Sequence, residues 1–143
     1  MKIFIDTNIL LDVLTGREPF YKNSAIIWSM VEKELVKGYI SAISVNNVYY
    51  IVKKQKGQSE AEKVVDKILK DFKVISLTYE ILKLARTMKE RDFEDIIQYF
   101  SALQTGCDFI ITRNKKDFPK KELEVDDPGE FIEKFDEILE KIE

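Results

Sequence analysis

Apolar residues fall into short runs that alternate along the chain with longer stretches of helical spacing. The short runs are rich in β-branched and aromatic residues and predict strands over residues 3–5, 39–43, 73–77 and 109–111, with a fifth, edge strand over 123–125. The longer stretches predict helices over residues 8–15, 20–37, 45–56, 59–72, 78–91 and 92–106, and from 128 to the end. Such alternation is typical of a parallel sheet with helices on both faces. We therefore expect an α/β fold: one three-layer α/β/α sandwich over residues 1–143, with a parallel sheet of four to five strands.

Capping residues support several of these boundaries. N-caps are expected before four helices, at Ser44, Ser59, Thr78 and Asp92. Glycines are expected to end three helices, at Gly38, Gly57 and Gly106. The last helix should present an apolar face made by Phe131, Ile132, Phe135, Ile138, Leu139 and Ile142.

Composition restricts the chemistry more than it restricts the fold. The 143 residues include no histidine and a single cysteine, Cys107, and the net charge is -3. Without histidine, Ser-His-Asp and Cys-His catalytic sites and histidine-bound zinc are excluded. No apolar run approaches the roughly 20 residues of a membrane helix, and nothing after Met1 is laid out as a signal peptide. We therefore expect a cytoplasmic protein that uses carboxylates, Lys, Tyr or bound water.

Polar residues gather where the predicted strands end and where one helix begins. They form four stretches, which are Asp6-Thr7-Asn8, Ser44 to Asn47, Asp92 to Asp95, and Thr112-Arg113-Asn114 with Asp117. The carboxyl ends of parallel strands meet at one edge of a sheet, where ligands bind in α/β folds. Carboxylates and carboxamides without His or Cys suit Mg²⁺ or Mn²⁺. The spacing therefore predicts an oxygen-ligand metal site around Asp6.

Each of these residues also has a purely structural interpretation. Asp6 can cap the short helix behind it, and Asp95 can be the partner of Asp92 in a capping box. Asn114 and Asp117 can form turns, because both residue types bond to their own backbone. Spacing alone leaves these alternatives open.

Taken together, the motifs resemble the PIN-domain family, and within it the VapC-like ribonuclease toxins. The resemblance rests on Asp6-Thr7-Asn8 after the opening strand, Asp92-Phe93-Glu94-Asp95 at a helix start, and the segment from Gly106 to Phe118. It continues to Pro128-Gly129-Glu130-Phe131 and so covers nearly the whole chain. It implies an endoribonuclease, of toxin type in some members, that hydrolyses RNA phosphodiester bonds with one or two Mg²⁺ or Mn²⁺ ions.

The resemblance also implies roles for individual residues and partners. The expected catalytic residues are Asp6, Asp95 and Asp117, and the expected metal ligands are Asp6, Asp95, Asp117 and Asn114. Supporting roles fall to Thr7, Asn47, Thr112, Arg113 and Asp92. The implied partners are an RNA substrate, a second copy of the chain in a homodimer and, for toxins, an antitoxin protein that blocks the site.

Asn47 departs from the family pattern. The family usually places a Glu in the helix after the second strand as a fourth acidic ligand, but here no acid occurs near Asn47 before Glu60. One branch that this chain resembles carries Asn before an aromatic pair, here Tyr49-Tyr50. An Asn side chain offers a carbonyl oxygen without charge, so we expect weaker metal binding, above all for a second ion.

Two other functions remain open from the sequence. Asn47 also fits a catalytically weak or inactive PIN-like module that binds RNA or another protein. In a receiver-like or phosphatase-like domain, Asp6 would instead be phosphorylated, although such sites need more carboxylates beside it. The basic run Lys53-Lys54-Gln55-Lys56 can contact RNA, or it can simply be a solvated helix end.

Overall fold

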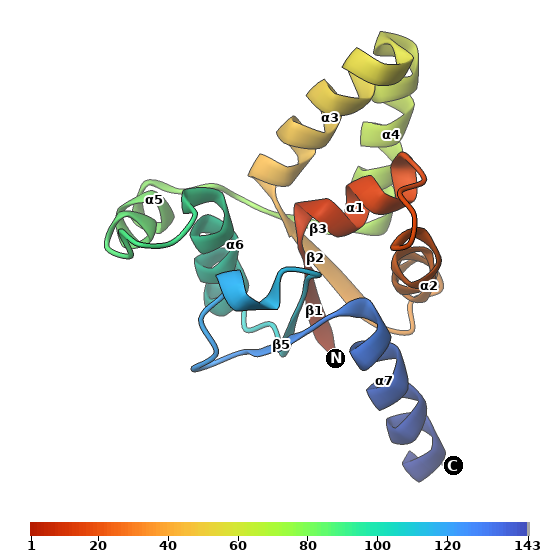
Figure 1. Ribbon diagram of the computed structural model, residues 1–143, viewed down its shortest axis with the longest axis vertical. Helices are drawn as coiled ribbons and strands as arrows, with labels where there is room; N and C mark the ends of the chain where they lie inside the picture. Colours follow the sequence, from red (N-terminus) through yellow and green to blue (C-terminus); the bar gives the residue numbers. More distant parts are fainter. Residues whose placement is uncertain (143) are drawn as a thin grey trace.

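A parallel sheet of five strands lies at the centre of the residues that the structure describes (Figure 1). The structure is a computed structural model that describes residues 1–142, with side chains described through residue 137. The strands are β1 (Lys2–Ile5), β2 (Lys37–Ser41), β3 (Lys73–Ile75), β4 (Phe109–Ile111) and β5 (Glu124–Asp126). They lie in the order β3-β2-β1-β4-β5, and each neighbouring pair is parallel. The carboxyl ends of all these strands therefore meet at one edge, as expected.

Helices cover both faces of this sheet. They are α1 (Thr7–Leu14), α2 (Tyr21–Glu32), α3 (Ala42–Lys56), α4 (Gln58–Asp71), α5 (Tyr79–Arg86), α6 (Phe93–Gln104) and α7 (Pro128–Ile142). Figure 1 shows α1, α2 and α7 on one side of the sheet and α5 and α6 on the other, with the α3–α4 pair extending beyond it. This arrangement confirms the three-layer α/β/α fold. Among the described residues, no helix combines the length and apolar character needed to cross a membrane.

Strand β1 is held by a separate apolar core on each face of the sheet. Ile3 and Ile5 pack in a core with α1, α2, α3, α4 and α7, whereas Phe4 packs against α6 through Tyr99 and Ala102. The side chains of Ile3, Phe4 and Ile5 are all buried. Because Asp6 follows this strand directly, packing on both faces fixes its position.

The predicted boundaries around the second strand are wrong. Helix α2 ends at Glu32 instead of Lys37, and Gly38 lies inside β2 instead of ending a helix. A Cβ atom on Gly38 would lie 2.8 Å from both methyl carbons of Val31 and 2.9 Å from the Phe72 ring. Glycine is therefore needed here because α2 and the end of α4 pack closely against this strand.

Two of the four predicted N-caps are wrong and two are confirmed. Ser41, not Ser44, caps α3, because its hydroxyl accepts from the Ile43 N–H at 3.2 Å. Helix α4 begins after Gly57 instead of Ser59. Thr78 and Asp92 cap α5 and α6 as predicted, although α5 ends at Arg86 instead of 91.

The last helix begins at Pro128 as predicted. Phe131 and Phe135 are buried in the core with α2, which confirms the first part of its apolar face. The predicted contributions of Ile138, Leu139 and Ile142 lie outside the described side chains.

A buried ion pair joins α1 to the segment that follows β4. Arg113 donates from Nε to Asp12 Oδ2 at 3.0 Å and from Nη2 to Oδ1 at 3.2 Å, and Asp12 is fully buried. The Phe20 ring covers the guanidinium, with 4.1 Å between Cζ and the ring centroid. Since Asn114 is the next residue, this pair also fixes the start of the loop that carries it.

We expect Arg113→Met to lower the free energy of unfolding by about 3 kcal/mol, because it leaves the Asp12 carboxylate buried and unpaired. Arg17 can compensate only in part, since its Nη1 lies 3.9 Å from Asp12 Oδ1. Urea denaturation measures the effect. The control is the double variant Asp12→Asn with Arg113→Met, which removes both charges and should recover part of the loss. An unchanged unfolding free energy in the single variant would contradict this role.

Candidate metal and nucleic-acid site

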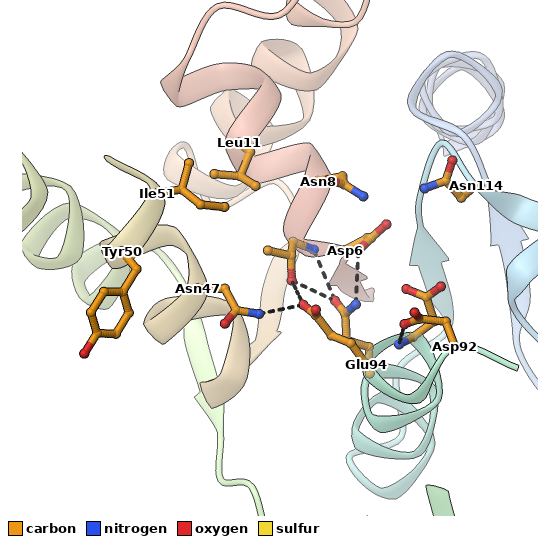
Figure 2. A pocket seen from close by; sticks show the side chains of 12 residues that line it. Asp6, Asn8, Leu11, Asn47, Tyr50, Ile51, Asp92, Glu94 and Asn114 are labelled. Atoms are coloured by element: carbon orange, nitrogen blue, oxygen red, sulfur yellow. Dashed lines mark hydrogen bonds between the residues drawn. The ribbon is translucent and has the colours of Figure 1, made fainter. Parts of the chain in front are cut away.

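A cavity of about 490 Å³ opens at the carboxyl edge of the sheet (Figure 2). It is lined by side chains from α1, α3, α6 and the segment after β4, which are Asp6, Thr7, Asn8, Leu11, Asn47, Tyr50, Ile51, Asp92, Glu94, Asp95, Gln98 and Asn114. Six of the residues predicted from the sequence are among them, namely Asp6, Thr7, Asn47, Asp92, Asp95 and Asn114. The fold thus brings at least one residue from each of the four predicted polar stretches to one place.

Asp6 is the most buried acid of this cavity, with only 1% of its surface exposed. Gln98 donates from Nε2 to its Oδ1 at 3.1 Å, and Thr112 donates from Oγ1 to its Oδ2 at 2.8 Å. Burial raises the pKa of Asp6 above its ordinary value, while these two hydrogen bonds act in the opposite direction. The carboxylate is therefore held in one orientation by α6 and by the end of β4.

Asp95 lies in the first turn of α6 and lines the same cavity as Asp6. Its pKa is raised to about 7, first by burial and then by the negative charges of Asp6, Asp92, Asp117 and Glu94. Among the described residues, none of the four acids that line the cavity forms an ion pair. Their negative charge is therefore left for protons or for a bound cation to neutralise.

Glu94 and Asn47 link α6 to α3 across the cavity. Asn47 donates from Nδ2 to Glu94 Oε1 at 2.9 Å, and Thr7 donates from Oγ1 to the same oxygen at 3.3 Å. The Thr7 hydroxyl also lies 2.6 Å from the Ser44 hydroxyl. This network joins α1, α3 and α6 next to Asp6.

Asp92 has the structural role that its spacing allowed. Its Oδ1 accepts from the Asp95 N–H at 3.0 Å, as an N-cap does. Within the described residues, the Asp95 carboxylate returns no hydrogen bond to Asp92, so the capping box is not completed. The Asp95 side chain is therefore available to the cavity that it lines.

The structure separates Asn114 from Asp117. Asn114 lines the cavity, whereas Asp117 lies in a 3₁₀ turn (Lys115–Asp117) and lines a neighbouring depression, which shares Asp92 with the cavity. The charge of Asp117 still contributes to the raised pKa of Asp95. A direct ligand role for Asp117 stays a prediction, and the geometry favours Asn114.

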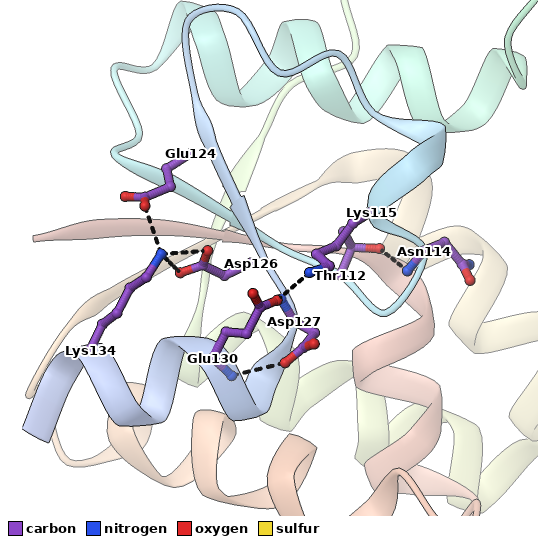
Figure 3. Close-up of polar contacts among 8 residues, drawn as sticks. All are labelled: Thr112, Asn114, Lys115, Glu124, Asp126, Asp127, Glu130 and Lys134. Carbon is purple, nitrogen blue, oxygen red and sulfur yellow. Dashed lines mark hydrogen bonds and ion pairs between the residues drawn. The ribbon is translucent and has the colours of Figure 1, made fainter.

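The loop that carries Asn114 is anchored at both ends (Figure 3). The Asn114 N–H donates to Thr112 Oγ1 at 3.0 Å, and Lys115 pairs with Glu130 at the start of α7. Glu130 in turn exchanges hydrogen bonds with Asp127, whose backbone N–H donates to Glu130 Oε1 and whose Oδ1 accepts from the Glu130 N–H. Asn114 is therefore positioned by contacts with β4 and α7.

Sequence reasoning missed three residues that organise this region. Gln98 follows Asp95 by three positions, so both lie on the same face of α6, and its polarity between buried Ile97 and Tyr99 was the available signal. Glu94 is distinguished in the sequence only as part of the Asp92-Phe93-Glu94-Asp95 motif. Asp12 lies on the buried side of α1 and is paired with Arg113.

The donor set fits a hard divalent cation. The polar side chains that line the cavity offer carboxylate, amide and hydroxyl groups and no imidazole or thiolate, which suits Mg²⁺ or Mn²⁺. In the described part of the chain, however, no three acidic side chains are grouped closely enough to hold an ion by themselves. A cation here would therefore rely on amide oxygens and water as well as carboxylates, as Mg²⁺ commonly does.

Comparisons with known proteins agree with this geometry. A family model described as PIN domain matches residues 2–116. The chain is 27% identical to Ribonuclease VapC1 of Aquifex aeolicus over 140 residues. The matched region covers 94% of this chain and 95% of that protein. Several solved structures share the fold. A toxin-antitoxin complex from Klebsiella pneumoniae matches with a TM-score of 0.65 and 24% identity, over 88% of this chain and 97% of that one. Mycobacterium tuberculosis VapC20, described as a sarcin-ricin-loop-cleaving toxin, matches with a TM-score of 0.63 and 14% identity, over 76% and 86%.

The raised pKa of Asp95 predicts that the metal-free protein loses stability as the pH rises. The folded protein keeps this proton between pH 3.8 and about 7, whereas the unfolded chain has already lost it. Because Asp95 is only half-buried, only part of its pKa shift contributes to the free energy of unfolding. We therefore expect Asp95→Asn in EDTA to be more stable than the original chain by roughly 1 kcal/mol at about pH 8.

Urea denaturation across the pH range measures this difference, which should disappear toward pH 4 as Asp95 becomes protonated. Asp66→Asn is the matched control, because Asp66 is an exposed carboxylate on α4. Equal stability of the Asp95→Asn variant and the original chain at high pH would show that the acids of the cavity do not repel one another.

Proposed function

The chain belongs to the PIN-domain family, and on that premise we propose that it is a Mg²⁺- or Mn²⁺-dependent endoribonuclease of VapC type that hydrolyses RNA phosphodiester bonds. The observation that carries the proposal is the buried Asp6 carboxylate, which Gln98 and Thr112 orient beside Asp95 in a cavity. Within the described residues, the acids of this cavity form no ion pair. The similarity to a protein named Ribonuclease VapC1, and the shared fold with a toxin that cleaves the sarcin-ricin loop, support an RNA substrate.

Each side chain would have a distinct task in this reaction. Asp6, Asp95 and Asn114 would hold the cation, and Asp117 would add negative charge from beside the cavity. When bound, the cation would activate water and offset the charge that develops on the phosphoryl oxygens. Gln98 and Thr112 keep the Asp6 oxygens oriented, so little rearrangement is needed when substrate arrives.

The wall of the cavity opposite the acids suits an unpaired nucleotide. Leu11, Ile51 and Tyr50 line it, and the Tyr50 ring is 61% exposed. An exposed aromatic ring can stack on a base, which is how proteins commonly hold single-stranded RNA. This wall supports RNA, as opposed to a small phosphate ester, as the substrate.

We also propose that the chain forms homodimers and binds an antitoxin protein. The shared fold with the Klebsiella pneumoniae toxin-antitoxin complex supports the antitoxin. Between α3, α4 and β3, the apolar side chains of Tyr50, Leu69 and Val74 are exposed and can contact a protein. Light scattering on the purified chain should give twice the monomer mass, and a monomer mass would contradict the homodimer.

We expect Asp6→Asn to reduce RNA cleavage by at least about a hundredfold, because it removes a central carboxylate from the cation site. The assay incubates a structured RNA with Mn²⁺, with Mg²⁺ and with EDTA, and EDTA should abolish cleavage. Asp66→Asn, in the exposed part of α4, should cleave like the original chain.

Cleavage that survives Asp6→Asn would contradict the nuclease assignment. If the original chain binds RNA in EDTA but never cleaves it, the chain is instead a PIN-like RNA-binding module, which is the function that Asn47 favours as an alternative.

A further inference from the structure

Glu94 belongs to the Asp92-Phe93-Glu94-Asp95 motif, but the motif assigned it no role in the site. It belongs to the first turn of α6 and is partly buried, and its side chain reaches across the cavity toward α1 and α3 (Figure 2). Its Oε1 accepts from Asn47 Nδ2 at 2.9 Å and from Thr7 Oγ1 at 3.3 Å. Both donors are neutral, so this acid keeps its negative charge uncompensated in the described part of the chain.

Asn47 and Glu94 are chemically matched to each other. An amide can donate a hydrogen bond to a carboxylate, whereas a second carboxylate at position 47 could not. An acid at position 47 would face Glu94 at hydrogen-bonding distance, and two like charges so close repel strongly in a partly buried site. The amide at position 47 therefore permits the acid at position 94.

From this pairing we infer that Glu94 supplies, from α6, the fourth acidic charge of the cation site, and that Asn47 holds it in place. The inference rests on the proposed function, because it concerns the same cation. On this inference, Asn47 does not leave the site one charge short. The acid lies on α6 instead of α3, on the other side of the cavity. Four acids line the cavity, namely Asp6, Asp92, Glu94 and Asp95.

A simpler explanation of Glu94 is that an acid in the first turn of a helix interacts favourably with the helix dipole. Glu80 provides the comparison, because it lies in the first turn of α5 and is exposed. A dipole role needs no contact with another helix, whereas Glu94 contacts side chains of both α1 and α3. The comparison of these two residues can therefore separate the two explanations.

The test is an exchange of charge between the two positions without a change of shape. Glu94→Gln keeps the hydrogen bond from Asn47 but removes the charge. Adding Asn47→Asp to Glu94→Gln returns one negative charge to the pair, with the amide now at position 94 as donor. Glu80→Gln is the matched control for a first-turn acid.

Calorimetric titration of each protein with Mn²⁺ alone gives the dissociation constant without any use of activity. We expect Glu94→Gln to weaken Mn²⁺ binding by about tenfold or more, and the exchanged variant to return to within about threefold of the original chain. Glu80→Gln should bind as the original chain does. Thermal unfolding in EDTA checks that every variant is folded.

The inference is overturned if Glu94→Gln binds Mn²⁺ as well as the original chain, or if the folded exchanged variant binds no better than Glu94→Gln. It is also overturned if the original chain binds no Mn²⁺. RNA cleavage by the original chain is measured separately. A chain that binds Mn²⁺ through Glu94 but cleaves no RNA would refute the proposed function and leave this inference standing.

Discussion

A carboxylate buried at the end of the central strand needs hydrogen-bond donors from within the protein. Asp6 receives them from Gln98 on α6 and Thr112 after β4, two elements that the chain reaches about a hundred residues later. Both elements lie beside β1 only because the strand order is β3-β2-β1-β4-β5. An unsatisfied buried carboxylate would be costly, so the topology of the sheet and the integrity of the site depend on the same contacts.

The same cavity gathers negative charge that no ion pair among the described residues neutralises. Elsewhere buried acids are paired, as Asp12 is with Arg113 and Asp126 is with Lys134. In the cavity the pKa of Asp95 rises to about 7 instead. The unpaired acids thus lower the stability of the metal-free protein at the place where a cation is expected to bind. Such perturbed acids are typical of functional sites.

The sequence was sufficient for the elements that depend on local patterns. Apolar periodicity predicted the strands, and the spacing of Asp6, Asp95 and Asn114 predicted residues that the fold brings to one cavity. It failed where a distant contact decides the conformation. Gly38 reads as a helix end, but close packing against Val31 and Phe72 places it in a strand. Likewise, the pairing of Arg113 with buried Asp12 could not be predicted from the sequence.

Asn47 shows the limit of assigning chemistry one position at a time. Considered alone, an amide in place of an acid predicts a weakened cation site, because a position in a motif carries no information about what lies across the cavity. The hydrogen bond from Asn47 to Glu94 changes that interpretation, since it joins two helices whose contact residues are 47 positions apart in the sequence. A cation responds to the total charge and the oxygen ligands around it, whichever helix supplies them. The loss of an acid at one motif position therefore does not by itself identify an inactive site, and the acids must be counted over the whole cavity.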